Sequence, residues 1–382
     1  MGPLNGIKVV EMAGIGPAPF CGMLLSDLGA EVIRIDRLAA ADLGFDIDRK
    51  FDFLNRGKRA VAIDLKAADG IATVRQLVAR ADVLIEGFRP GVMERLGLGP
   101  EDLKEANPRL VYGRMTGWGQ DGPMKNLAGH DINFISMMGV LNSIGHKDGP
   151  PAVPLNLIGD FGGGGLYLAM GVLAALLESR VSGQGQVVDA AMVDGVASLM
   201  TMHFGFRQAG LWENARGSNT LDGGSPYYTT YRTRDGRFMA VGAVEKRFYG
   251  ELLERLGLAG ADLPERNDRT RWSELRDRIA SVFSTRTRDE WTSVFADSDA
   301  CVTPVLDIDE CMTHPLAAAR NIFVPRDGAT EPAPAPRFSR TPGQIGGAPV
   351  DPRRDTRDAL LHWGLSESRI GELAAAGVIA PR

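Results

Sequence analysis

Cysteine and histidine are both scarce in this sequence. The 382 residues include three cysteines, Cys21, Cys301 and Cys311, and five histidines. The cysteines are odd in number and widely spaced, and neither a Cys-x-x-Cys nor a His-x-x-x-His pair occurs. This spacing argues against a disulfide scaffold and against a zinc site, and it favours a reducing compartment. We therefore expect a protein without a bound metal.

A surplus of positive charge and a long apolar run are also missing. Lysine and arginine number 43 against 48 aspartates and glutamates, which gives a net charge of −5. A dedicated nucleic-acid-binding protein usually needs a basic face, so nucleic acid is not an expected partner. Residues 1–7 lack the regions of a signal peptide, and the longest uncharged apolar run, residues 161–177, is short for a membrane span. We expect a cytoplasmic protein that does not cross a membrane.

The first half of the chain alternates between strand-like and helix-like segments. Apolar spacing predicts helices at residues 17–28 and 67–81. Short runs rich in β-branched residues predict strands at residues 7–12, 31–36, 82–86 and 110–115. This alternation predicts an α/β fold with a parallel sheet and crossover helices.

Longer apolar segments follow residue 160, and the pattern changes after the polar, glycine-rich stretch at residues 208–224. Apolar helices are expected at residues 162–179 and 191–207, with a short strand at 186–190 between them. After a polar, glycine-rich stretch, Asp235-Gly236 predicts the turn of a hairpin formed by residues 227–234 and 237–244. Further helices are expected at residues 246–256, 271–283, 288–296 and 355–363. The later part is therefore expected to contain a smaller α+β unit.

Gly14-Ile15-Gly16 is the first motif that suggests a ligand. It follows an expected strand, as in a nicotinamide dinucleotide site. However, Pro19 stands where the third glycine would be, and Pro17 removes an N–H group from the helix start. We interpret the motif as a strand-to-helix turn of a different α/β fold.

Asp160 precedes four consecutive glycines at the expected start of an apolar helix. Each glycine costs about 0.5–1 kcal/mol relative to alanine, so we expect these glycines to admit a ligand closely. Asp160 is then either a helix N-cap or a catalytic base or nucleophile. Backbone N–H groups beside it would stabilise an enolate or oxyanion.

His130 lies 30 residues before Asp160, and each of the two follows a glycine. Alone, His130 would be interpreted as a structural residue, but together with Asp160 it is a candidate general acid or base. No Gly-x-Ser-x-Gly motif occurs, which argues against a hydrolase. Basic residues near the ends of expected strands predict a site for a phosphorylated ligand. They are Arg37, Lys66, Arg89 and Arg95.

Several of these motifs occur together in one known family. The sequence resembles the family III CoA-transferase superfamily, and within it the α-methylacyl-CoA racemases. The segments that carry His130 and Asp160 are the racemase-specific part of the resemblance. The matching stretches are residues 4–11, 26–36, 89–92, 116–120, 129–133, 159–164 and 183–190.

The resemblance implies a two-domain α/β fold and an interlocked homodimer. Residues 1–190 would form a Rossmann-like, CoA-binding large domain that is completed by residues 330–382. Residues 191–225 would form a linker helix and a crossing segment, and residues 226–329 a smaller α+β domain. The active site would lie between the large domain of one subunit and the small domain of its partner.

The resemblance also assigns roles to individual residues. Glu245 matches a small-domain glutamate that pairs with the catalytic histidine. The expected CoA contacts are Arg37, Ile63, Asp64, Leu65, Lys66, Gly87, Phe88, Arg89, Arg95, Gly129, Asp131, Ile132, Asn133 and Phe134.

These roles predict a racemase that interconverts (2R)- and (2S)-2-methylacyl-CoA thioesters by 1,1-proton transfer through an enolate. His130, oriented by Glu245, would act on one face and Asp160 on the other, and no cofactor is needed because CoA is part of the substrate. Two alternatives stay open: a CoA-transferase with Asp160 as nucleophile, and an acyl-CoA-binding module without catalysis. Five methionines would either fill the core or form an adaptable wall for the acyl chain. They are Met137, Met138, Met192, Met200 and Met202.

Overall fold

The chain forms two compact units. The computed structural model describes residues 2–39 and 47–380. Residues 1–138, 155–199 and 318–382 belong to the first unit, and residues 139–154 and 200–317 belong to the second. The chain therefore leaves the first unit and later returns to it. The expected domain boundaries at residues 190, 225 and 329 stay a prediction.

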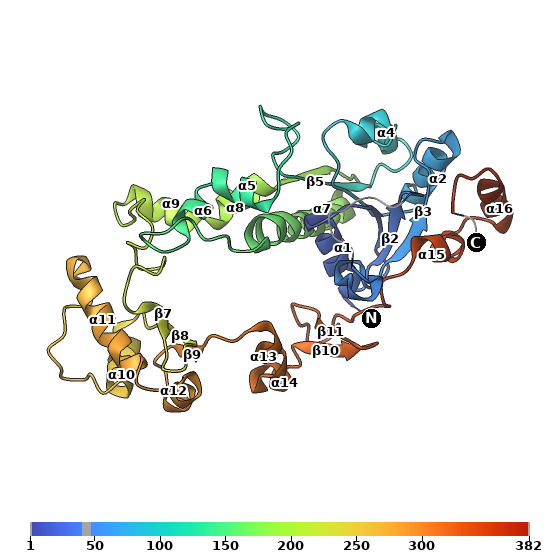
Figure 1. The fold of residues 1–382 in the computed structure, drawn as a ribbon. Coiled ribbons are helices and arrows are strands. Elements are labelled where there is room, and N and C mark those ends of the chain that lie inside the picture. The colour runs from blue at the N-terminus through green and yellow to red at the C-terminus, as the bar shows by residue number, and fades with distance from the viewer. Residues whose placement is uncertain (1, 40–46, 381–382) are drawn as a thin grey trace. The chain divides into compact units, whose positions relative to one another are not determined.

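The first unit is built on a six-stranded parallel sheet (Figure 1). In sheet order the strands are β3 (Arg59–Ala62), β2 (Glu31–Asp36), β1 (Lys8–Met12), β4 (Val83–Glu86), β5 (Val111–Thr116) and β6 (Val187–Ala191). All five pairings are parallel, which confirms the predicted α/β fold. The sequence analysis missed β3, because its four residues include two alanines and give a weak strand signal.

Helices cover both faces of this sheet. Neighbouring residues of β1 point to opposite faces, so Val10 joins one apolar core and Val9 the other. The first core includes α2 (Ala68–Val78), α3 (Val92–Arg95), α4 (Pro100–Lys104), α15 (Pro352–His362) and α16 (Glu367–Ala375). The second includes α1 (Pro17–Asp27), α5 (Asp131–Met137) and α7 (Leu166–Ser182). Of these, α3, α4, α5 and α16 are absent from the sequence-based expectation.

The C-terminal part of the chain is fastened to this unit by polar contacts. The amide of Ala62 in β3 donates to Oγ1 of Thr356 in α15 at 2.9 Å. Upstream, β10 (Phe323–Arg326) and β11 (Ala329–Pro332) form an antiparallel pair. Glu331 of β11 and Asp27 of α1 both form ion pairs with Arg56, and all three side chains are no more than 3% exposed.

The glycine-rich segment differs from its prediction. A helix is expected to start at residue 162, whereas a π-helix, η3 (Leu157–Gly165), begins five residues earlier and continues into α7. We expected these glycines to let a ligand approach closely. Three of them instead allow neighbouring helices to pack closely against η3. A Cβ atom would lie 2.8 Å from Val196 at position 163, 2.9 Å from Met192 at position 164, and 2.7 Å from the Pro17 carbonyl oxygen at position 165.

The apolar helices around residues 157–208 also differ in length from their predictions. The helix expected over residues 191–207 is divided into α8 (Met192–Leu199) and α9 (Thr201–Gln208). The segment Leu157–Ser182 is the one helix in the described ranges that is long and apolar enough to cross a membrane. A single such helix is weak evidence for a membrane span, because core helices have the same composition.

The second unit has its own sheet and its own core. Strands β7 (Tyr228–Arg232), β8 (Phe238–Gly242) and β9 (Val302–Pro304) form an antiparallel sheet in that order. The pairing of β7 with β8 confirms the predicted hairpin around Asp235-Gly236. The predicted charged helices are also confirmed. They are α10 (Lys246–Arg255), α11 (Trp272–Phe283) and α12 (Arg288–Phe295).

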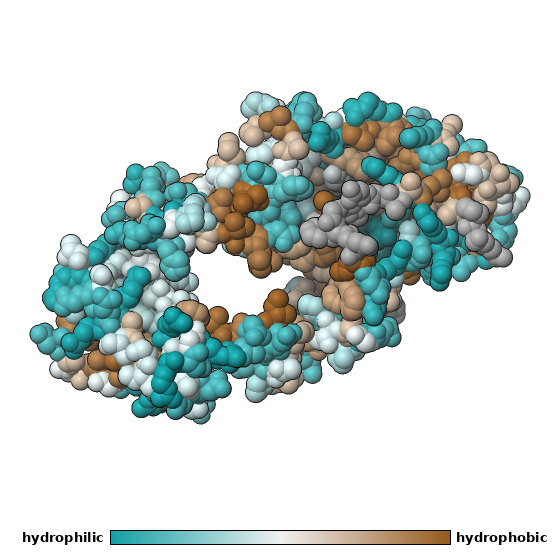
Figure 2. Space-filling model, viewed as in Figure 1, coloured by the Kyte–Doolittle hydropathy of each residue, from teal (hydrophilic) through white to brown (hydrophobic). Residues whose placement is uncertain are grey.

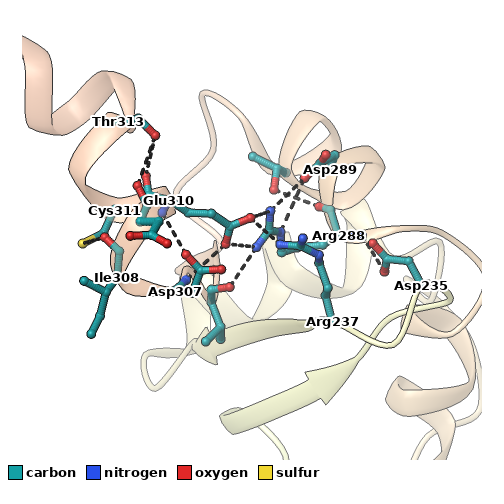
Figure 3. Close-up of polar contacts among 12 residues, drawn as sticks. Asp235, Arg237, Arg288, Asp289, Asp307, Ile308, Glu310, Cys311 and Thr313 are labelled. Atoms are coloured by element: carbon teal, nitrogen blue, oxygen red, sulfur yellow. Dashed lines mark hydrogen bonds and ion pairs between the residues drawn. The ribbon is translucent and has the colours of Figure 1, made fainter.

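A cluster of charged residues connects α13 (Ile308–Thr313) to the rest of the second unit (Figure 3). Arg288 donates from its two Nη atoms to the two carboxylate oxygens of Glu310 at 2.7 Å each. Arg237, which lies just before β8, also forms an ion pair with Glu310. The bonds from Arg288 hold the pKa of Glu310 far below its usual range. The cluster therefore joins α13 (Ile308–Thr313) to α12 and to the β7–β8 hairpin.

Candidate active site

His130 lies at the start of α5, in the segment that follows β5. It is the N-cap residue of α5, and its backbone N–H donates to Oδ1 of Asn133 at 3.0 Å. Its side chain is exposed. Gly129 is required next to it, because a Cβ atom there would lie 2.8 Å from the Phe134 ring, which packs edge-on against Trp118. The imidazole is therefore held on a fixed backbone and is open to a ligand.

The segment around Asp160 is bonded directly to the segment around His130. Oδ2 of Asp131 accepts the backbone N–H groups of Gly159 at 2.5 Å and of Asp160 at 2.8 Å. Asp131 therefore already occupies these two N–H groups, and the expectation that backbone N–H groups near Asp160 stabilise an enolate oxygen stays a prediction. The contact brings the two candidate bases to one place in the first unit.

The Asp160 carboxyl is half-buried, and burial is the main cause that raises its pKa. The charge of Asp131 raises the pKa further, whereas a hydrogen bond from Nδ2 of Asn156, at 3.0 Å, and the charge of His130 lower it. A raised pKa brings the protonated and ionised forms of this carboxyl closer in free energy, which suits a group that must both take up and return a proton.

The Gly14-Ile15-Gly16 motif has a structural role that does not involve a dinucleotide. Gly16 has a φ of 67°, and a Cβ atom there would lie 3.2 Å from Oδ2 of Asp160. The motif therefore forms the turn that leads into α1 and leaves room for the Asp160 carboxyl. Asn156, which the sequence analysis missed, carries one usable signal: it lies four residues before Asp160, the spacing of neighbours on a helix.

Glu245 lies in the second unit, where it is the exposed N-cap residue of α10. Its carbonyl oxygen accepts the N–H of Tyr249 at 2.9 Å, and Arg266 donates to the carbonyl of the preceding residue, Val244. These contacts fix its backbone and leave its carboxylate at the surface. Its pairing with His130 stays a prediction.

The four basic residues expected to bind CoA lie at one edge of the parallel sheet. Arg37 directly follows β2, Lys66 and Arg89 follow β3 and β4, and Arg95 ends α3. All four are exposed. None of the ion pairs formed within residues 2–39 and 47–380 involves them. Four exposed cations at the carboxyl edge of an open α/β sheet form a suitable surface for phosphate groups.

The other expected CoA contacts differ in their exposure. Gly87, Ile132 and Asn133 are exposed, and Asp64, Leu65, Phe88 and Gly129 are partly buried. The side chains of Ile63, Asp131 and Phe134 are buried, so they are not available to a ligand.

The five methionines considered for an acyl-chain wall also differ in exposure. Met192 is a core residue, whereas Met137 and Met202 are about half exposed and Met138 and Met200 are partly buried.

Comparison with known proteins decides the family. A sequence profile of CoA-transferase family III matches residues 4–356 of the chain. The chain belongs to CoA-transferase family III. Its fold is that of a solved structure described as a CAIB/BAIF family protein from Brucella suis, with a TM-score of 0.82 and 26% identity over 95% of this chain and 99% of that one.

Within CoA-transferase family III, the chain is similar to two racemases over nearly its whole length. It is 46% identical to the α-methylacyl-CoA racemase of Mus musculus and 45% identical to that of Homo sapiens, over 98% of this chain and 97% of each of those proteins. It is 31% identical to the succinyl-CoA–D-citramalate CoA-transferase of Chloroflexus aurantiacus, over 99% of this chain and 98% of that protein.

Proposed function

We propose that this chain is an α-methylacyl-CoA racemase, which interconverts (2R)- and (2S)-2-methylacyl-CoA thioesters. The observation that carries this proposal is the joining of the His130 and Asp160 segments through Asp131. Two proton-transfer groups at one site are what inversion at a single carbon needs. The similarity to the mouse and human racemases supports the same activity.

The chemistry follows from the acidity of the proton next to the thioester carbonyl. A base removes this proton to give an enolate, and inversion requires that a proton returns to the opposite face. One side chain cannot easily reach both faces, so two groups in complementary protonation states are needed. We assign His130 to the proton of the (2S) form and Asp160 to that of the (2R) form. The raised pKa of Asp160 supports both of its proposed roles, the removal of a proton from the (2R) form and the return of a proton to the enolate.

Glu245 completes the proposed set of catalytic residues. A carboxylate beside an imidazole fixes its tautomer and stabilises its protonated form. In an interlocked homodimer the small domain of one subunit would supply Glu245 to His130 of its partner. The reaction needs no cofactor beyond the CoA of the substrate, and we propose a cytoplasmic location.

The homodimer is supported by apolar surface on α7. Leu166, Met170, Leu177 and Val181 recur at the spacing of one helix face and are each at least 50% exposed. Figure 2 shows apolar residues, in brown, at the surface of the part of the first unit that contains α7. Exposed apolar patches of this kind mark interfaces. Sedimentation should give about twice the chain mass of 41.1 kDa, and a species of the chain mass would contradict the dimer.

Substitution of Arg89 by alanine tests the CoA surface. A charge-assisted hydrogen bond to phosphate contributes about 1.5–3 kcal/mol, so KM should rise about 10- to 100-fold while kcat changes little. Arg180→Ala is the matched control, because Arg180 is also exposed and is the basic residue in the last turn of α7. Steady-state kinetics at two salt concentrations measure the effect, and equal KM values for the two variants would remove Arg89 from the CoA site.

The experiment that tests the function is proton NMR of each 2-methylacyl-CoA enantiomer with the protein in deuterated water. We expect loss of the α-proton and interconversion of the enantiomers without any added carboxylic acid. The similarity to a CoA-transferase makes the second candidate a transferase with Asp160 as nucleophile. In that case CoA would appear on an added acid, and no α-proton would exchange in its absence. Binding of CoA without either reaction would indicate a binding module.

A further inference from the structure

Asp131 carries a buried carboxylate that the proton transfer itself does not use. It is the first residue of α5, directly after His130, and it is 3% exposed. Both of its hydrogen bonds come from amides and end on Oδ2, whereas Oδ1 is buried without a partner among the described residues. Burial of a carboxylate in such surroundings costs folding free energy. We therefore expect it to serve the site rather than the stability of the fold.

The chain makes room for this carboxylate at Gly159. A Cβ atom at position 159 would lie 2.7 Å from Oδ2 and 2.9 Å from Cγ of Asp131. Any larger residue would push the start of η3 away from the start of α5. The contact between the start of η3 and the start of α5 therefore requires glycine at position 159.

We propose that Asp131 is a positioning residue that holds the backbone of Asp160 at a fixed place relative to His130. This inference rests on the proposed racemase function. The first N–H groups of a helix have no partner within it, so Gly159 and Asp160, near the start of η3, need an acceptor from elsewhere. Asp131 supplies the acceptor, and because it follows His130 directly in the chain, the contact fixes Asp160 relative to the second base. A misplacement of about 1 Å at such a site can cost about 10²-fold in rate.

The charge of Asp131 also acts on Asp160. Asp131 and His130 are the titratable groups that shift the pKa of Asp160; Asn156 adds an uncharged hydrogen bond, and Gly16 on the α1 side adds no charge. Asp160 accepts the proton of the (2R) substrate only when it is ionised. Removal of the Asp131 charge should lower the pKa of Asp160, so the reaction of the (2R) form should begin at a lower pH.

Two substitutions separate position from charge. Asp131→Ala removes the acceptor of both N–H groups, whereas Asp131→Asn keeps one oxygen that can accept both and removes the charge. Asp262→Asn, at an exposed carboxylate of the second unit, is the matched control. Because the equilibrium between the enantiomers is fixed, kcat/KM must change equally in both directions. The readout is therefore the initial α-proton exchange of each pure enantiomer in deuterated water as a function of pH, together with KM and the melting temperature.

For Asp131→Ala we expect exchange of the (2R) form to fall about 10²-fold, with a much smaller loss for the (2S) form and little change in KM. For Asp131→Asn we expect near-normal exchange and a (2R) profile that begins to rise at lower pH. An equal loss for both enantiomers, or no loss in the alanine variant, would overturn the proposal. If the alanine variant does not fold, the asparagine variant decides: a shifted (2R) profile supports the proposal and an unshifted one refutes it. If the wild-type protein exchanges neither enantiomer, it is the proposed function that fails.

Discussion

Replacement of His130 by alanine is expected to slow the interconversion of (2R)- and (2S)-2-methylacyl-CoA by about 10²–10⁴-fold. The imidazole is exposed at the start of α5 and is the proposed base for the proton of the (2S) form. Without it, one face of the enolate has no group to remove or return a proton. Exchange of the (2S) α-proton should fall with the interconversion, because Asp160 serves the other face. Proton NMR in deuterated water measures both quantities on one sample.

The control for this variant is His146→Ala, at another exposed histidine. It should interconvert the enantiomers at the wild-type rate. A normal rate in the His130→Ala variant would refute the assignment of two bases. CoA transfer to an added acid that survives the loss of His130 would instead favour a transferase, because Asp160 alone is the nucleophile in that mechanism.

Replacement of Arg56 by alanine is expected to lower the free energy of unfolding by about 3–5 kcal/mol. Arg56 donates to Oδ2 of Asp27 at 2.6 Å and to Oε2 of Glu331 at 3.1 Å. Its removal leaves Asp27 buried without its cation, and it leaves Glu331 with Arg326 alone. The loss is large because the penalty for a buried, uncompensated carboxylate exceeds the value of a surface ion pair. Urea denaturation followed by circular dichroism measures the difference.

Arg59→Ala provides the matched control for Arg56. Arg59 also pairs with a carboxylate of the first unit, Asp355, but at 3.7 Å and with 39% of its own side chain exposed. Such a pair contributes about 0–1 kcal/mol. Losses of similar size in the two variants would contradict the argument from burial.

Much of the first unit could be predicted because its strands and helices carry periodic signals. The predicted strand at residues 31–36 coincides with β2, and the predicted helix at residues 17–28 ends one residue beyond α1. The short helices α3 and α4 have four and five residues, too few for a period to be visible. The π-helix η3 was missed for a different reason: its shape depends on α1 and α8 packing against its glycines, which is a tertiary contact.

In the candidate site, too, features with a local sequence signal could be predicted, and features that depend on tertiary contacts could not. Asp160 was identified from the four glycines that follow it, and His130 from its pairing with Asp160 and from the family resemblance. The role of Asp131 depends on a hydrogen bond between residues 29 positions apart, and no local pattern contains it. The family resemblance implied that Asp131 is a CoA contact, whereas its carboxylate is buried and bonds the start of η3.

The π-helix η3 also limits how the length of this segment can vary during evolution. In a π-helix each N–H group bonds the carbonyl five residues earlier, instead of four as in α7. Deletion of one residue between 157 and 165 would allow α7 to extend backward as a regular helix, and each residue of such a helix turns the chain by about 100°. The side chain of Asp160 would then turn away from Gly16 at the start of α1, next to which its carboxyl now lies. We expect this segment to accept several substitutions more readily than one insertion or deletion, so the number of its residues, as well as their identity, is part of the site.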